Sequence, residues 1–187
     1  MSDEEHPGEE AAQELRDMIG TPIGAPSVAP DPVNQPMIRH WAAAMEDHNP
    51  VNADVAVAKA SRFGGIVAPP LMLQTWTMPT PKISGIAERG GAPTEFASNP
   101  LTHLDEAGFI ATLATNSEFE IFRYLRLGEV ITSTMVIETV SDEKQTRIGP
   151  GHFITWVATF RDERGEVVGR QLFRILKFKP DLEALLK

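Results

Sequence analysis

Cysteine is absent from this chain of 187 residues. Its absence excludes disulfides, thiolate nucleophiles and cysteine-based metal sites, and we expect the cytoplasm as the natural setting. No apolar run approaches the roughly 18 residues that a membrane-spanning helix needs, and the acidic N-terminus lacks the regions of a secretory signal. Basic residues are few, since 17 Lys and Arg against 26 Asp and Glu give a formal net charge of -9. This balance argues against nucleic acid as a partner.

The first 32 residues are predicted to precede a single domain that spans residues 33–187. We expect an acidic, disordered leader over residues 1–10 and a short helix over residues 11–19. The apolar face of this helix is predicted to consist of Leu15, Met18 and Ile19. Five prolines then predict an extended connector up to Pro36.

The remaining elements change from helices to strands along the chain. Helices are predicted at 37–46, 55–62 and 70–78, and Pro79 and Pro81 cut the third one short. Segments rich in Val, Ile, Thr and Phe, separated by turn residues, then predict an antiparallel meander of four strands, at 112–125, 129–140, 153–161 and 167–178. Helices followed by strands indicate an α+β fold.

The most informative stretch is residues 47–60, which read Asp-His-Asn-Pro-Val-Asn-Ala-Asp-Val-Ala-Val-Ala-Lys-Ala. It resembles the signature of the MaoC-like, R-specific enoyl-CoA hydratases, in which Asp-x-Asn-Pro is followed by an aliphatic residue, a histidine and a second aspartate. Every slot is filled except one, because Asn52 occupies the histidine position. Residues 63–72, Phe-Gly-Gly-Ile-Val-Ala-Pro-Pro-Leu-Met, resemble the segment that leads into the central helix of that family. The resemblance covers about residues 33–178.

The resemblance implies a hotdog fold, in which a curved antiparallel sheet wraps around a central helix. It also implies addition of water across the double bond of an enoyl thioester. In the family an aspartate, here Asp47, and a histidine hold the water, and a backbone N–H polarises the thioester carbonyl. Asn52 cannot carry a proton near neutral pH, and the glycine that supplies the N–H is replaced within Pro69-Pro70, where proline has no N–H. Asp47 and Asn52 are therefore interpreted as a degenerate site with no confident catalytic residue.

A degenerate site predicts a partner. Hotdog proteins act in pairs, and we expect this chain to form a heterodimer or heterotetramer with a catalytic MaoC-like subunit that keeps the Asp/His pair. The chain most resembles the larger subunit of actinobacterial heteromeric hydratases for steroid side-chain CoA thioesters, which normally continues into a second domain. No cofactor is expected beyond the CoA thioester as substrate.

The shortened central helix predicts a wide acyl tunnel that accepts bulky acyl groups. Its lining is predicted to include Val67, Ala68, Pro70, Leu71, Met72 and Trp76, with Leu73 and Met78 beside them.

Alternatives remain open at the level of sequence. The chain can be read as a self-sufficient homodimeric hydratase or thioesterase that uses Asp47 with Asn52 or His48. It also resembles, through its Ala-Pro-Pro segment, a stabilising subunit of a hydroxyacyl-carrier-protein dehydratase.

His103 and His152 have no acidic residue at metal-ligand spacing, so no metal site is expected. Four basic residues of the strand region are more readily explained as solvated than as CoA-phosphate ligands: Arg123, Arg126, Lys144 and Arg147.

Overall fold

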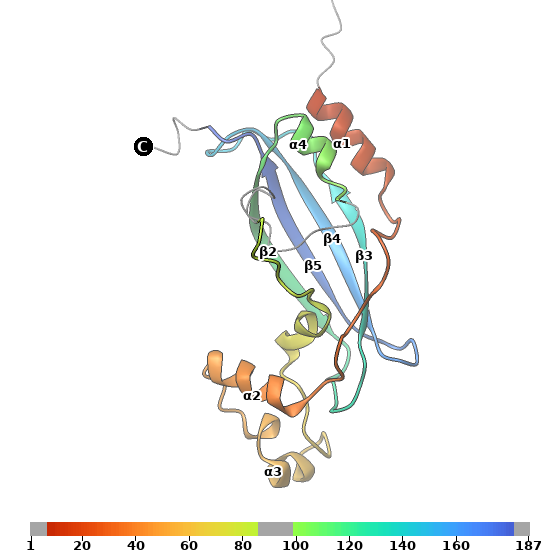
Figure 1. Cartoon of the computed structure of the whole chain (residues 1–187), viewed down its shortest axis with the longest axis vertical. Helices are drawn as coiled ribbons and strands as arrows, with labels where there is room; N and C mark the ends of the chain where they lie inside the picture. Colours follow the sequence, from red (N-terminus) through yellow and green to blue (C-terminus); the bar gives the residue numbers. More distant parts are fainter. Residues whose placement is uncertain (1–6, 86–98, 182–187) are drawn as a thin grey trace, which may run out of the picture.

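The computed structural model describes residues 7–85 and 99–181. Its main feature is a long, curved antiparallel sheet of five strands (Figure 1). The strands lie in the order β1-β3-β4-β5-β2, and every pair is antiparallel. Their bounds are Ser27–Val28 for β1, Ala111–Ile121 for β2, Thr132–Val140 for β3, Gly151–Arg161 for β4 and Val167–Phe178 for β5. The predicted α+β class is confirmed.

The prediction of a four-stranded meander was wrong for β2. Only β3, β4 and β5 follow one another as neighbours, whereas β2 pairs with β5 at the far edge of the sheet. The reason lies in residues 122–131, which form a wide loop in place of a tight turn. Val67 pairs with Arg126 in this loop, and the Ala68 N–H donates to the Leu125 carbonyl at 2.9 Å. These bonds hold the loop against the segment before the central helix, so the chain crosses to the opposite edge before β3 begins.

The helices are short. Their bounds are Pro7–Asp17 for α1, Gln35–Ala44 for α2, Val55–Ala60 for α3 and Thr102–Glu106 for α4, with 3₁₀ turns η1 at Pro50–Asn52 and η2 at Pro70–Thr77. The predicted central helix is thus present but is a 3₁₀ helix. The sequence did not indicate α4.

Helix α1 begins earlier than predicted. Residues 7–10 are helical, so the expectation of disorder was wrong for them, while residues 1–6 lie outside the described residues. The buried face consists of Gly8, Ala11, Ala12 and Leu15. Ile19, which was placed on that face, lies beyond the end of the helix and is 44% exposed.

The proline-rich connector is extended, as predicted, and lies along the edge of β3. Backbone N–H groups of Gly20, Ile23 and Ala29 donate to the carbonyls of Ile137, Met135 and Ile131 at 2.8–2.9 Å. Because proline cannot donate, the connector can follow only an outer edge of the sheet.

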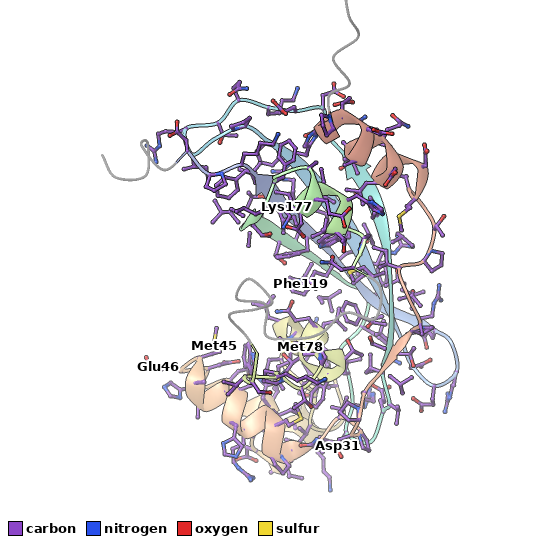
Figure 2. All side chains as sticks on the ribbon, turned by 45° about the horizontal axis from the view of Figure 1, so that its top comes forward. Asp31, Met45, Glu46, Met78, Phe119 and Lys177 are labelled. Atoms are coloured by element: carbon purple, nitrogen blue, oxygen red, sulfur yellow. The ribbon has the colours of Figure 1, made fainter. Side chains whose placement is uncertain are left out.

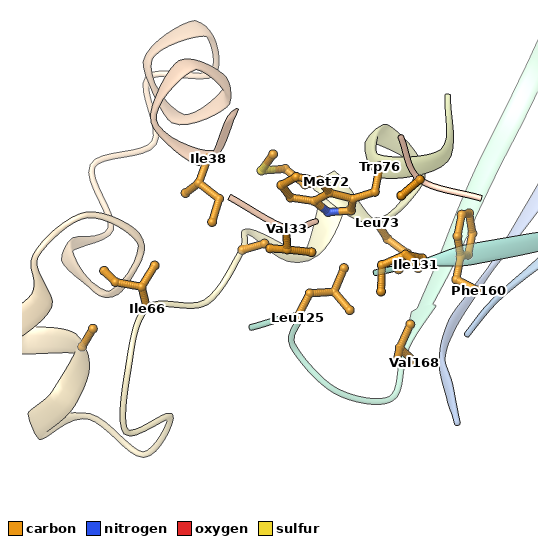
Figure 3. Close-up of a cluster of buried hydrophobic side chains, with 13 residues drawn as sticks. Val33, Ile38, Ile66, Met72, Leu73, Trp76, Leu125, Ile131, Phe160 and Val168 are labelled. Atoms are coloured by element: carbon orange, nitrogen blue, oxygen red, sulfur yellow. The ribbon is translucent and has the colours of Figure 1, made fainter. Parts of the chain in front are cut away.

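The core consists of two clusters on one face of the sheet, one at the η2 end and one at the end covered by α1 and α4 (Figure 2). The η2 cluster gathers Met72, Leu73 and Trp76 with residues of α2 and of the sheet end near the start of β5 (Figure 3). The α1 cluster joins Ala11 and Leu15 of α1 to α4 and to the opposite end of the sheet.

In the described residues, no helix is long and apolar enough to cross a membrane.

Candidate functional site

The signature residues form the turn that follows α2. Helix α2 is capped by Asn34, whose side chain accepts from the Met37 N–H at 3.0 Å. After its last residue, Glu46 adopts a positive φ of 53°, and the Asp47 N–H donates to the Ala42 carbonyl at 2.9 Å. The chain therefore reverses at Asp47, which is half-buried.

Both carboxylate oxygens of Asp47 accept hydrogen bonds from its own turn. Oδ1 accepts from the backbone N–H of Asn49 at 3.0 Å, and Oδ2 accepts from the side-chain Nδ2 of Asn52 at 3.3 Å. The structure thus brings together the two residues that the sequence predicted as a pair. In this arrangement Asp47 has the contacts of a turn-stabilising residue.

Asn52 is fixed in place and buried. It is 3% exposed, its N–H donates to the Asn49 carbonyl at 3.1 Å, and its own carbonyl accepts from Gln35 Nε2 at 2.9 Å. An amide so placed can orient a partner but cannot accept and release a proton near neutral pH. Gln35, one turn before Ile38 in α2, gave no signal in the sequence.

The other signature residues are caps. The Asn49 side chain accepts from the Val51 N–H at 3.3 Å and starts η1. Asp54 caps α3 by accepting from the Ala56 and Val57 N–H groups at 2.8 and 3.1 Å. His48, the alternative proton carrier, is exposed, and no side-chain hydrogen bond joins it to another described residue.

The expected oxyanion position lacks a donor. Val67 and Ala68 are buried, and Pro69 and Pro70 follow them directly at the start of η2. Neither proline has an N–H. The carbonyl of Pro69 accepts from the Met72 N–H at 3.0 Å, which closes the first turn of η2.

The residues predicted to line an acyl tunnel do not share one environment. Met72, Leu73 and Trp76 are 0–2% exposed and face the η2 cluster, whereas Leu71 is 50% and Met78 60% exposed. Pro70 is half-buried. Leu71 therefore lies on the outer side of η2, and Met78, directly after η2, is also exposed. Contact of the whole set with substrate remains a prediction. The buried indole Nε1 of Trp76 has no hydrogen-bond partner within residues 7–85 and 99–181.

A pocket of about 500 Å³ lies between the β2–β3 loop and the β4–β5 turn, and neither Asp47 nor Asn52 lines it. It is organised by Arg123, whose guanidinium lies 2.8 Å from both Glu129 and Asp162 and 3.6 Å from Glu166. Burial lowers the pKa of Arg123, but these carboxylates raise it to a net value above the ordinary one. For Asp162, burial alone would raise the pKa, but hydrogen bonds from two backbone N–H groups and from Arg123 lower it below its ordinary value. Arg123 therefore ties the β2–β3 loop to the β4–β5 turn. The expectation of a solvated side chain was wrong for this residue, because Arg123 is half-buried and paired with carboxylates.

Histidines contribute no metal centre among the described residues, where no group of three His, Cys, Asp or Glu could hold an ion. His152 is buried, with Nδ1 at 3.0 Å from the Ser141 carbonyl and its ring edge-on to Phe109. His103 lies 3.1 Å from Glu14 on the surface.

Comparison with known proteins agrees with this geometry. Residues 17–171 match the family described as FAS1-like, dehydratase domain region. The chain is 40% identical over 181 residues to a probable enoyl-CoA hydratase alpha subunit of Thermomonospora curvata, across 92% of this chain and 53% of that protein. It is 42% identical over 156 residues to the 3-oxo-4,17-pregnadiene-20-carboxyl-CoA hydratase alpha subunit of Mycobacterium tuberculosis, across 83% of this chain and 48% of that protein. The chain thus spans about half the length of these curated relatives.

Solved structures give the same result. A chain in the crystal structure of the ChsH1–ChsH2 complex from Mycobacterium tuberculosis matches with a TM-score of 0.76 and 37% identity, across 92% of this chain and 91% of that one. The MaoC-like dehydratase from Rhodospirillum rubrum matches with a TM-score of 0.57 and 18% identity, across 90% and 98%, which supports the fold alone. With the five-stranded sheet, the short central helix and the Asp-x-Asn-Pro turn, these matches show that the chain belongs to the FAS1-like dehydratase domain family and has the MaoC-like hotdog fold.

Proposed function

We propose that this chain is the non-catalytic, acyl-binding half of a heteromeric enoyl-CoA hydratase for bulky, steroid-type acyl thioesters. One observation carries the proposal: the position of the family's catalytic histidine holds Asn52, buried and bonded to Asp47 at 3.3 Å. General acid–base catalysis contributes typically about 10² to 10⁴ in rate, and an amide cannot supply it.

A second loss at the same site supports the proposal. Pro69 and Pro70 remove the backbone donor that would polarise the thioester carbonyl, and one such donor is worth about 10² to 10³ in rate. The two losses act on different steps of the chemistry, so replacing one residue does not restore the site.

The relatives support a role within a heteromer. Both curated relatives are described as hydratase alpha subunits, one of a probable enoyl-CoA hydratase and the other of a hydratase for a pregnadiene carboxyl-CoA thioester. The matched crystal structure is that of a complex of two named components. We infer a catalytic hotdog partner that retains the Asp/His pair, in a heterodimer or heterotetramer, and a bulky acyl-CoA as the shared substrate.

The test measures hydration of a steroid-type enoyl-CoA by the chain alone, by the catalytic subunit alone, and by the two together. The expected result is co-elution of the two proteins and efficient turnover only by the mixture. Turnover by this chain alone, abolished by Asp47→Asn, would show that the chain is a self-sufficient enzyme.

The Asn52→His variant sharpens the test. On the proposal, this variant of the isolated chain stays inactive, because the thioester carbonyl still meets Pro70 without an N–H. If the single substitution Asn52→His restored hydration, the backbone N–H donor would not be required, and the histidine would be the only group that the site lacks.

A further inference from the structure

A polar strip interrupts the apolar face of the sheet between the two core clusters. We define this strip as Gln74 of η2, Gln171 of β5 and Ser117 of β2. Gln171 Nε2 donates to Gln74 Oε1 at 2.7 Å and to Ser117 Oγ at 2.9 Å. The three side chains therefore form one hydrogen-bonded unit that joins η2 to the two strands.

Strand register places the polar strip on the same face as the cores. Along β5, Gly169, Gln171, Phe173 and Ile175 alternate onto one face. Gly169 lies against the η2 cluster, since a Cβ there would come within 2.7 Å of Leu73. Ile175 belongs to the α1 cluster. Gln171 thus stands between the two clusters, next to Phe173.

The polar strip keeps unused hydrogen-bonding groups. Both N–H groups of the Gln171 amide are used, which fixes the orientation of its neighbours. The Nε2 of Gln74 and the hydroxyl hydrogen of Ser117 then remain as donors with no partner in the described part of the chain. Gln74 and Gln171 are half-buried and Ser117 is exposed, so these donors lie at an accessible surface.

The position of the polar strip relative to the degenerate site fits an acyl group. Gln74 follows Pro70, the residue at the thioester position, by four residues of η2. At a rise of about 2.0 Å per residue, these four residues span about 8 Å. An acyl group that starts at Pro70 and follows η2 reaches the polar strip several bonds beyond the thioester.

We propose that Gln74 and Ser117 are specificity-determining residues that bind an oxygen atom, a ring ketone or hydroxyl, carried by the acyl group at this distance, and that Gln171 positions them. The proposal rests on the proposed function, because it takes the acyl thioester as the ligand of this face. Two donors fixed by a shared amide favour an oxygen acceptor over a methylene, since an apolar group would cover the donors without satisfying them.

The test compares two ligands and needs no turnover. Calorimetry measures the affinity of the complete heteromer for a saturated fused-ring acyl-CoA with one ring ketone, and for the same thioester with a methylene in its place. We expect the wild-type complex to prefer the ketone by about tenfold. Gln74→Met and Ser117→Ala should each reduce this preference to about threefold or less, with little change in affinity for the methylene ligand.

The control is Gln145→Met, on the exposed β3–β4 connection, which should keep the full preference. Ser117→Ala removes only one exposed hydroxyl. Its result therefore remains informative even if the larger Gln74→Met substitution disturbs the fold. The absence of any preference in the wild type, or an unchanged preference in both strip variants, would overturn the proposal. Failure of the proposed function looks different: the complex would not hydrate the corresponding enoyl-CoA even where the ketone preference is present.

Discussion

The Asp47→Ala variant tests whether Asp47 stabilises the turn or takes part in catalysis. The variant removes two acceptors, one for the exposed Asn49 N–H and one for the Asn52 amide. Water can replace the first, but Asn52 is 3% exposed, and a buried donor left without a partner costs about 1–3 kcal/mol. We therefore expect a loss of about 2 kcal/mol, which lowers Tm by about 4–8 °C for a domain of this size.

The assay pairs thermal unfolding with kcat/KM of the heteromer. Asp47→Ala should lower Tm while leaving kcat/KM within about threefold, far less than the 10² to 10⁴ expected for a catalytic base. Asp47→Asn keeps one acceptor and should fall between the wild type and Asp47→Ala in stability. His48→Ala, at the exposed neighbouring position, is the matched control and should change neither quantity. The reasoning is refuted by a hundredfold loss of kcat/KM in Asp47→Asn with an unchanged Tm.

Three further predictions concern the fold. Ile137→Ala, in the α1 cluster at 0% exposure, should cost about 2–5 kcal/mol in denaturant unfolding, against about 1 kcal/mol for Val136→Ala on the opposite face. Gly169→Ala should cost about 1–3 kcal/mol, because its Cβ would lie 2.8 Å from a backbone oxygen of β2, whereas Gly65→Ala meets no atom within 4 Å and should be nearly neutral. The lowered pKa of Asp162 stabilises the fold above the unfolded-state pKa of about 3.9, and this stabilisation is lost as pH falls through the lower folded value. Asp162→Asn should therefore flatten the acid limb of the stability–pH curve, and an unchanged slope would contradict the assignment.

The sequence was sufficient to predict features that depend on local chemistry. Asn52 lies beside Asp47 largely because an Asn-Pro turn and a capping Asp54 fix the intervening backbone. β5 matches its predicted bounds, 167–178, since alternation and flanking turn residues mark both ends. The extended connector follows from its prolines in the same way.

Features that depend on distant contacts escaped prediction. The placement of β2 beside β5 follows from the loop that pairs with Val67 and is held by Arg123, and neither contact has a local signal. Helix α4 has five residues, too few for a hydrophobic period to be visible. It is held in place by Leu104, which is buried in the α1 cluster, and by the ion pair of Asp105 with the buried Lys177 at 2.5 Å.

Retention of the signature in a chain that lacks the histidine has a structural explanation. Asn49 starts η1, Asp54 starts α3, and Asp47 accepts two hydrogen bonds from the turn between them. Asn52 supplies an N–H donor to Asp47, as a protonated ring nitrogen would, so the turn keeps its shape although proton transfer is lost. Most of the signature therefore encodes the backbone of the turn and only one position encodes the proton carrier. If the proposed function is correct, we expect the residue at the position of Asn52 to distinguish catalytic from non-catalytic subunits better than the rest of the motif does.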